Sequence, residues 1–153
     1  MKTIILALCA FTLSHTVSAQ ATQASQPAAQ QKKADELVKF TELKYNFGKI
    51  KQGVPVTHDF SFVNVGSQPV VIESATASCG CTTPTWPKTP VTKDQKDKIS
   101  AGFNAASAGP FEKTITVKVA GYQMPLDLHI SGEVLSADDY AKYEASKPKK
   151  SGR

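Results

Sequence analysis

Residues 114–119 read TITVKV, and this strict alternation of polar and apolar side chains decides the fold class. Successive side chains of a β-strand point to opposite faces, so Ile115, Val117 and Val119 share one face and the polar residues share the other. A helix would instead place apolar residues three or four positions apart. The segment is therefore predicted to be a half-buried strand whose apolar face covers a core.

The same period of two recurs through residues 40–136, interrupted about every ten residues by Gly, Pro or Asn. The inward residues expected in the other segments are Phe40, Leu43, Tyr45 and Phe47; Val54, Val56, His58, Phe60 and Phe62; Val70 and Ile72; Ile99, Ala101 and Phe103; and Met124, Leu126, Leu128, Ile130 and Val134. His129 is expected to face outward. The Pro-rich stretch between Ile72 and Ile99 is expected to be irregular.

About seven strands without a helical period predict an all-β fold, an immunoglobulin-like antiparallel β-sandwich over residues 39–136, although a small barrel has similar spacing. Ser136 followed by Asp139 resembles a capping box. It predicts a short C-terminal helix that ends before Pro148, with a basic tail, in residues 137–153.

The N-terminus has the features of a secretory signal peptide. Lys2 precedes a short apolar stretch, and Val17-Ser18-Ala19 is a small-residue cleavage site before Gln20. We expect residues 1–19 to be removed, Cys9 with them, and the product to be periplasmic or extracellular. Residues 20–38, rich in Gln, Ala and Ser, are predicted to form a flexible, disordered linker.

The charge distribution argues against a nucleic-acid partner. The chain has 18 Lys and Arg against 13 Asp and Glu, but the surplus lies in the tail at Lys147, Lys149, Lys150 and Arg153. A nucleic-acid reader needs a dense basic face on its folded part. No segment after the signal is long and apolar enough to be a transmembrane helix.

Cys79-Gly80-Cys81 holds the two cysteines that remain after signal cleavage. In an extended chain both sulfurs point to one side, and Gly80 permits the bend that brings them together. Three interpretations stay open: a disulfide that fixes the local geometry, a reversible redox pair, and a soft-metal site for Cu or Zn. As a staple, a ring of about three residues contributes at most roughly 1.6 kcal/mol.

The segment that follows the cysteines is a candidate partner-binding loop, from Cys79 to Pro90. Its candidate contact residues are Gly80, Thr82, Pro84, Trp86 and Pro87. Trp86 either caps one end of the sandwich or is an exposed anchor for a partner.

Several motifs together resemble the bacterial family called domain of unknown function 1573. They are Phe47-Gly48-Lys49-Ile50, Gly53, the run FSFVNVG at residues 60–66, PVVI at 69–72 and SCGCT at 78–82. The resemblance implies an exported module of the immunoglobulin type, related to the hydin and sperm-protein class of sandwiches. It implies no activity. Lys93-Asp94-Gln95-Lys96-Asp97 departs from the Pro-Gly type of turn expected before the Ile99 strand.

No catalytic motif of the Gly-x-Ser-x-Gly, His-Glu-x-x-His or phosphate-loop type occurs in the sequence. We therefore expect a non-catalytic binding or structural module without a cofactor, whose partner is a protein or another envelope component. It would act through the loop of residues 79–90 or through an unpaired sheet edge. The alternatives are a periplasmic metal-binding protein that uses Cys79 and Cys81, and a thiol-disulfide redox protein.

Overall fold

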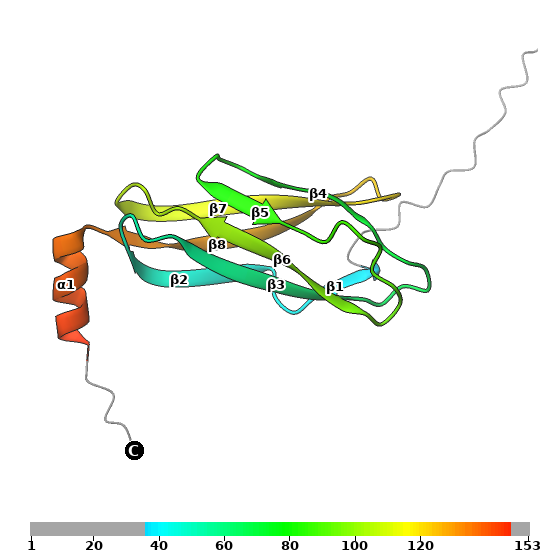
Figure 1. Cartoon of the computed structure of the whole chain (residues 1–153), viewed down its shortest axis with the longest axis horizontal. Helices are drawn as coiled ribbons and strands as arrows, with labels where there is room; N and C mark the ends of the chain where they lie inside the picture. Colours follow the sequence, from blue (N-terminus) through cyan, green and yellow to red (C-terminus); the bar gives the residue numbers. More distant parts are fainter. Residues whose placement is uncertain (1–35, 148–153) are drawn as a thin grey trace, which may run out of the picture.

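The computed structural model describes residues 36–147, which form two packed sheets and one helix (Figure 1). In chain order the elements are β1 (Val38–Phe40), β2 (Lys44–Lys51), β3 (Val56–Asn64), β4 (Ile72–Ala77), β5 (Thr82–Thr85), β6 (Lys96–Phe103), β7 (Gly109–Val119), β8 (Leu126–Leu135) and α1 (Ala137–Ser146). None of the helices in this part of the chain is long and apolar enough to cross a membrane.

The predicted β-sandwich is confirmed. One sheet has the strand order β1-β3-β6-β5 and the other β2-β8-β7-β4. All neighbours are antiparallel except β2 and β8, which run parallel, so the fully antiparallel expectation is wrong for this pair. The helix lies at one end of the sandwich, and β1 lies towards the other (Figure 1).

The inward faces of both sheets meet in an apolar core, as the alternation predicts. Val54 and Met124 are exceptions, with 48 and 49% of their surface exposed. Both precede the first residue of their strands, β3 and β8, so the period of two does not yet apply to them. The fully or nearly fully buried side chains include Phe60, Phe62, Ile99, Ile115, Val117, Leu128 and Ile130.

Residues 40–47 form parts of two strands, where the sequence indicated one. Phe40 ends β1, which pairs with β3, whereas Tyr45 lies in β2, which pairs with β8 in the other sheet. The chain crosses between the sheets at Leu43, which is 44% exposed. Parity fails here because a crossing strand changes which direction is inward.

The ordered domain also begins earlier than expected. The linker was predicted to extend through residue 38, yet Val38 is buried in β1 and Leu37 packs against the core. The rest of the predicted linker, the predicted signal peptide and the basic tail from residue 148 lie outside the described residues.

The predicted helix start is confirmed. The Asp139 backbone N–H donates a hydrogen bond of 3.2 Å to Ser136 Oγ, and the Ser136 hydroxyl donates one of 2.7 Å to the Asp139 carboxylate. That hydroxyl, helped by Lys142, holds the pKa of Asp139 below its usual value. The helix is held near β2 by Lys49, whose ammonium lies 5.1 Å from the centre of the Tyr143 ring.

A polar cluster joins β3 to β6 on the outer face of the first sheet. Asp59 accepts a hydrogen bond of 2.6 Å from Lys98 and one of 2.5 Å from Ser100, the residue opposite it in the register. These bonds, Lys98 first, hold the pKa of Asp59 below its usual value. The ionised carboxylate is therefore the form that stabilises the fold.

Replacing Asp59 with Asn should therefore lower stability at neutral pH and matter less in acid. A lowered folded-state pKa contributes stability that is complete above the unfolded pKa, at about 4, and is lost as the pH falls through the folded value. Urea unfolding from pH 2 to pH 7 should show the two proteins converging below about pH 4. Asp94→Asn, which changes an exposed carboxylate, is the control; an equal effect there would contradict the assignment.

Candidate functional site

The CGC motif forms the corner where the chain passes from one sheet to the other. It leaves β4, at the edge of the second sheet, and enters β5, at the edge of the first. The N–H of Ser78 donates to the carbonyl of Thr114 at 2.9 Å, and the N–H of Asn104 donates to the carbonyl of Cys81 at 3.1 Å. Both sheets thus hold the corner from its two sides.

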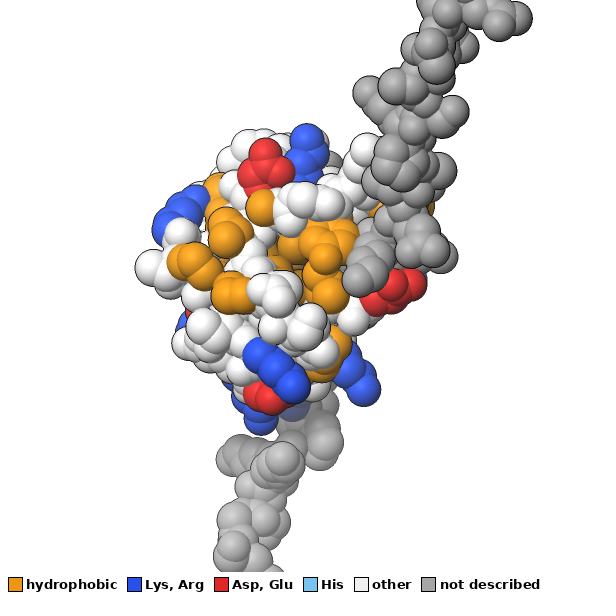
Figure 2. Space-filling view, turned by 90° about the vertical axis from the view of Figure 1, so that its right-hand side faces the viewer, with side chains coloured by type: hydrophobic (Ala, Val, Ile, Leu, Met, Phe, Trp, Pro, Cys, Tyr) orange, Lys and Arg blue, Asp and Glu red, His pale blue; other side chains and the backbone are white. Residues whose placement is uncertain are grey.

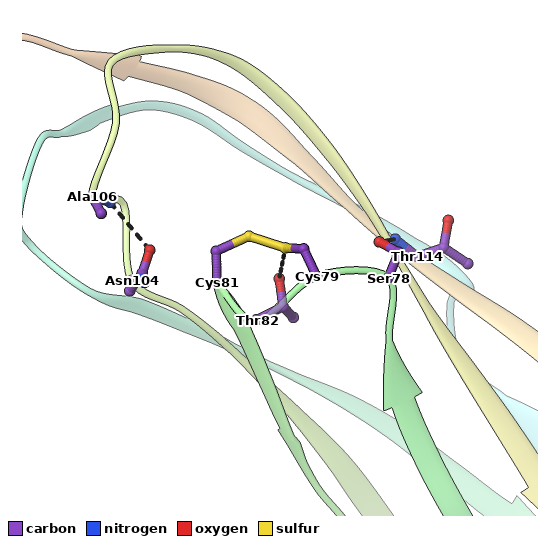
Figure 3. Close-up of a disulfide and its surroundings, with 7 residues drawn as sticks. All are labelled: Ser78, Cys79, Cys81, Thr82, Asn104, Ala106 and Thr114. Carbon is purple, nitrogen blue, oxygen red and sulfur yellow. Dashed lines mark hydrogen bonds between the residues drawn. A yellow bond between two sulfur atoms is a disulfide. The ribbon is translucent and has the colours of Figure 1, made fainter.

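The two cysteines lie together at this corner, with Cα atoms 5.4 Å apart and their sulfur atoms in bonding contact (Figure 3). The Cα separation is typical of a disulfide. Both residues are half-buried, whereas Gly80 between them is exposed. Thr82 is only 4% exposed, and its Oγ1 lies 3.9 Å from Cys79 Sγ.

The proposed binding loop is not one loop. Residues 82–85 form β5, in which Thr82 lies opposite Phe103 and Thr85 lies opposite Ser100. Four extended residues span about 13 Å, so the cysteine pair and Trp86 are separated along the sandwich. The segment from Cys79 to Pro90 is therefore a strand with a cysteine corner before it and Trp86 after it, instead of a continuous loop.

Pro84 explains why sequence reasoning missed this strand, because proline was read as a sign of irregular chain. In an antiparallel pair, every second residue bonds to the neighbouring strand, and the bond from the Asn104 N–H to the Cys81 carbonyl shows which residues of β5 do so. Residues 83 and 85 then bond to β6, while Thr82 and Pro84 direct their backbone groups outward. Pro84, which lacks an N–H, sacrifices no ladder hydrogen bond at this edge position.

Trp86 is half-buried and packs against the core, as does Cys81. Its Nε1 is buried and has no hydrogen-bond partner within residues 36–147. The ammonium of Lys88 lies 3.2 Å from the centre of the ring, a cation–π contact. Trp86 therefore packs against the core and is not a freely exposed anchor. Pro87 is half-buried as well.

β4 presents an unpaired edge beside the corner. Every second residue of β4 bonds to β7. Because Ser78 bonds to Thr114, residues 74 and 76 also direct their backbone N–H and C=O groups towards β7. The N–H and C=O groups of Ala75 and Ala77 consequently point away from β7, and no other described strand pairs with them. The outward side chains beside them, Ser74 and Thr76, are small.

The other three edges are less suited to pairing. β1 has three residues, and β5 offers no free N–H, because Thr82 N–H bonds to the Cys79 carbonyl at 3.3 Å and Pro84 has none. β2 has a register irregularity between Asn46 and Lys49, and it carries three lysines. Short strands, prolines, bulges and lysines are the usual devices that protect edges.

Sequence reasoning did not identify the β4 edge. Its residues, ESATAS at positions 73–78, are all polar or small, so they give little hydrophobic contrast. The only indication in the sequence is that residues 73–78 lack Gly and also lack Pro and Lys, which usually protect an edge strand from pairing.

A second surface is the end of the sandwich that carries β1. Hydrophobic side chains gather in the middle of this end (Figure 2). The connections that meet here include Val65 and Met124, which are 45 and 49% exposed. Within residues 36–147 these side chains remain exposed, so this end is an alternative contact surface.

The histidines do not join the cysteines. His58 faces inward as predicted, stacks on Tyr45 with ring centres 3.5 Å apart and contacts Glu42 at 3.0 Å. His129 Nδ1 lies 3.3 Å from Thr114 Oγ1. Within residues 36–147, no group of three or more His, Cys, Asp and Glu side chains is arranged to hold a metal ion. The two sulfurs would have to bind a metal without a third such ligand from this region.

Residues 38–134 match the family described as protein of unknown function (DUF1573). The chain belongs to this family. Its motifs now have structural reasons: the Phe47-Gly48 pair forms the irregularity of β2, with Gly48 at a φ of 68°, and Asn64 and Gly66 organise the exit from β3. The CGC motif of this DUF1573 domain is the corner between its sheets.

Solved structures show the same fold at low sequence identity. A PapD-like domain of human CEP192 has a TM-score of 0.59 at 12% identity, covering 84% of this chain and 99% of its own. A protein of unknown function from Porphyromonas gingivalis W83 has a TM-score of 0.56 at 15% identity, covering 64% of this chain. The DUF1573 chain spans 46% of that second protein.

A family 123 glycoside hydrolase from Clostridium perfringens also matches, with a TM-score of 0.53 at 12% identity, over 61% of this chain and 23% of the enzyme. At such identities and partial coverage the likeness concerns the fold alone. No curated protein matches the sequence.

Proposed function

We propose that this DUF1573 domain is an exported, non-catalytic module that binds an extended segment of a protein partner along β4. The observation that carries the proposal is the pair of outward backbone positions at Ala75 and Ala77. An added strand would complete their hydrogen bonds, and main-chain pairing of this kind accepts many sequences. The PapD-like neighbour supports the fold on which such an edge is built.

The corner extends this surface. A strand laid along β4 passes Ala77 and then meets Ser78 and the Cys79–Cys81 pair. We infer that the mature protein holds these cysteines as a disulfide after export, because exported compartments are oxidising. The exposed Gly80 then lies at the end of the strand-binding edge. The disulfide keeps this end in one conformation, and its contribution to global stability is small.

The soft-metal alternative has weaker support. Two thiolates begin a coordination sphere, but a structural zinc site needs four ligands. The described part of the chain brings no further His, Cys, Asp or Glu into a group with them.

Replacing Ala77 with Pro should weaken partner binding by about tenfold or more, because it removes an outward N–H and places a ring at the edge. The probe is a peptide selected from a displayed library on the full chain and then synthesised. Ala77→Val is the matched control, since it adds bulk but keeps the N–H and should bind within about threefold of the wild type. Isothermal titration gives both affinities.

Amide hydrogen exchange tests the site itself. Peptide binding should slow exchange at the N–H groups of Ala75 and Ala77 and leave those of β2 unchanged. Protection on β2, or at Val65 and Met124 on the far end, would overturn the assignment to β4. Equal binding of the Pro and Val variants would do the same.

A further inference from the structure

A cleft of about 210 Å³ opens beside one of the two cysteines. It lies between the β4–β5 corner and the connection from β6 to β7. Its lining residues are Cys81, Phe103, Asn104, Phe111, Lys113 and residues 106–110. Cys79 is not among them, so the cleft adjoins Cys81 and not Cys79.

The two sulfurs also differ in their neighbours (Figure 3). Cys81 lies on the side of Asn104 and Ala106, whereas Cys79 lies on the side of Ser78. Cys79 Sγ has the hydroxyl of the buried Thr82 at 3.9 Å. A hydroxyl at this position is able to donate a hydrogen bond to a thiolate on Cys79. Cys81 is thus the cysteine beside the cleft, and Cys79 is the cysteine with a donor beside its sulfur.

Lys113 gives the cleft a positive charge. Its side chain lines the same cleft as Cys81, and no salt bridge within residues 36–147 neutralises it. Thiol-disulfide exchange requires an attacking thiolate, which is an anion. A nearby ammonium therefore favours the approach of a thiolate, and more so when the thiol compound carries further negative charge.

The geometry points to a thiol-disulfide exchange site for a small anionic thiol; this inference rests on the disulfide proposed above. The incoming thiolate forms a new S–S bond with Cys81 Sγ, and the bond between the two cysteines breaks. Cys79 leaves with the electron pair as a thiolate, accepts the hydrogen bond of Thr82 and is then protonated by water. The thiol is the reductant. Attack by Cys79 on Cys81 in the mixed disulfide reverses the step.

The backbone hydrogen bonds of the corner do not depend on the disulfide. Ser78 stays bonded to Thr114, and Cys81 stays bonded to Asn104, through backbone groups that do not involve sulfur. The Cys79 thiol therefore stays close to the mixed disulfide on Cys81 in the folded domain, which favours closure of the ring. The exchange changes the end of the β4 edge without unfolding the sandwich.

The test uses the full chain in its oxidised form and reduced glutathione as the anionic probe. After acid quenching and alkylation of free thiols, peptide mass mapping should find glutathione on Cys81 and the alkyl group on Cys79. Glutathione on Cys79, equal labelling of both, or reaction only in denaturant would overturn the inference. An oxidised protein that lacks the two-hydrogen mass loss of a disulfide overturns it as well.

Kinetics test the cleft. Lys113→Ala should slow exchange with glutathione about threefold at low salt and leave exchange with the cationic thiol cysteamine unchanged or faster. Lys118→Ala is the matched control, since Lys118 lies on the same strand outside the cleft. Equal rates for wild type and Lys113→Ala with both thiols would contradict the role of Lys113. Peptide protection at β4 is measured separately, so failure of exchange and failure of strand binding are distinguished.

Discussion

Replacing Asn64 with Ala is expected to lower the free energy of unfolding by about 2 kcal/mol or more. Asn64 is fully buried. Its Nδ2 donates to the carbonyls of Gln68 and Val91, both at 2.8 Å, and its Oδ1 accepts from the N–H of Gly66 at 2.8 Å. Removal of the side chain leaves the buried N–H of Gly66 without a partner, which costs about 1 to 3 kcal/mol, and it leaves a cavity. The carbonyl of Val91 keeps its bond to the Val70 N–H, and the carbonyl of the exposed Gln68 can bond to water.

The chain contains its own control for this prediction. Asn46 makes the same local contact, since its Oδ1 accepts from the N–H of Gly48 at 2.7 Å, but this residue is exposed. Water replaces the lost bond there, so Asn46→Ala should cost less than about 1 kcal/mol. Urea unfolding of both variants measures the difference. Similar losses for the two would contradict the view that burial makes Asn64 important.

Asn64 also connects the fold to the proposed binding edge. Its amide holds the carbonyl of Val91, and Val91 forms a two-way backbone bridge with Val70, at 2.8 and 2.9 Å. Val70 lies two residues before β4 begins. The buried Asn therefore helps to fix the connection that leads into β4.

The sandwich was predictable because its inner strands alternate strongly. Ile115 and Val117 are both fully buried, as the period of two requires. The prediction failed where tertiary pairing overrides local pattern. Leu43 crosses between sheets, and Met124 lies in the turn before β8, so neither position is governed by the parity of a continuous strand.

The site was only partly predictable, for reasons of chemistry. The sequence identified Cys79 and Cys81 because two cysteines with one residue between them are conspicuous. It did not identify Ala75 and Ala77, because an edge is a property of topology, and their contribution comes from backbone groups that every residue carries. Lys113 escaped notice as well, since its neighbour across the cleft is 32 positions away in the chain.

Replacing Gly132 with Ala is expected to cost about 2 kcal/mol, through crowding alone. Gly132 lies in β8, opposite Phe111 and beside the irregular part of β2. A Cβ at this position would lie 2.8 Å from the carbonyl oxygen of Gly48 and 2.9 Å from the Phe111 ring. Backbone strain is not the cause, because its φ lies outside the left-handed region.

Neither neighbour is able to yield easily. The Gly48 oxygen belongs to the backbone, and the Phe111 ring is stacked on Phe103 with ring centres 4.1 Å apart. The variant must therefore move β2 away from β8 or disturb this stack. Thermal unfolding should show a fall of about 8 °C or more in the midpoint, given about 4 °C or more for each kcal/mol in a domain of this size.

Gly80→Ala is the matched control, because a Cβ there meets nothing within 4 Å and the residue also lies outside the left-handed region. The same substitution should then leave stability within about 0.5 kcal/mol of the wild type, or raise it slightly by restricting the unfolded chain. A fall at Gly80 as large as that at Gly132 would show that glycine is needed for its backbone freedom. A fall confined to Gly132 shows instead that the close approach of β2 to β8 depends on the missing side chain.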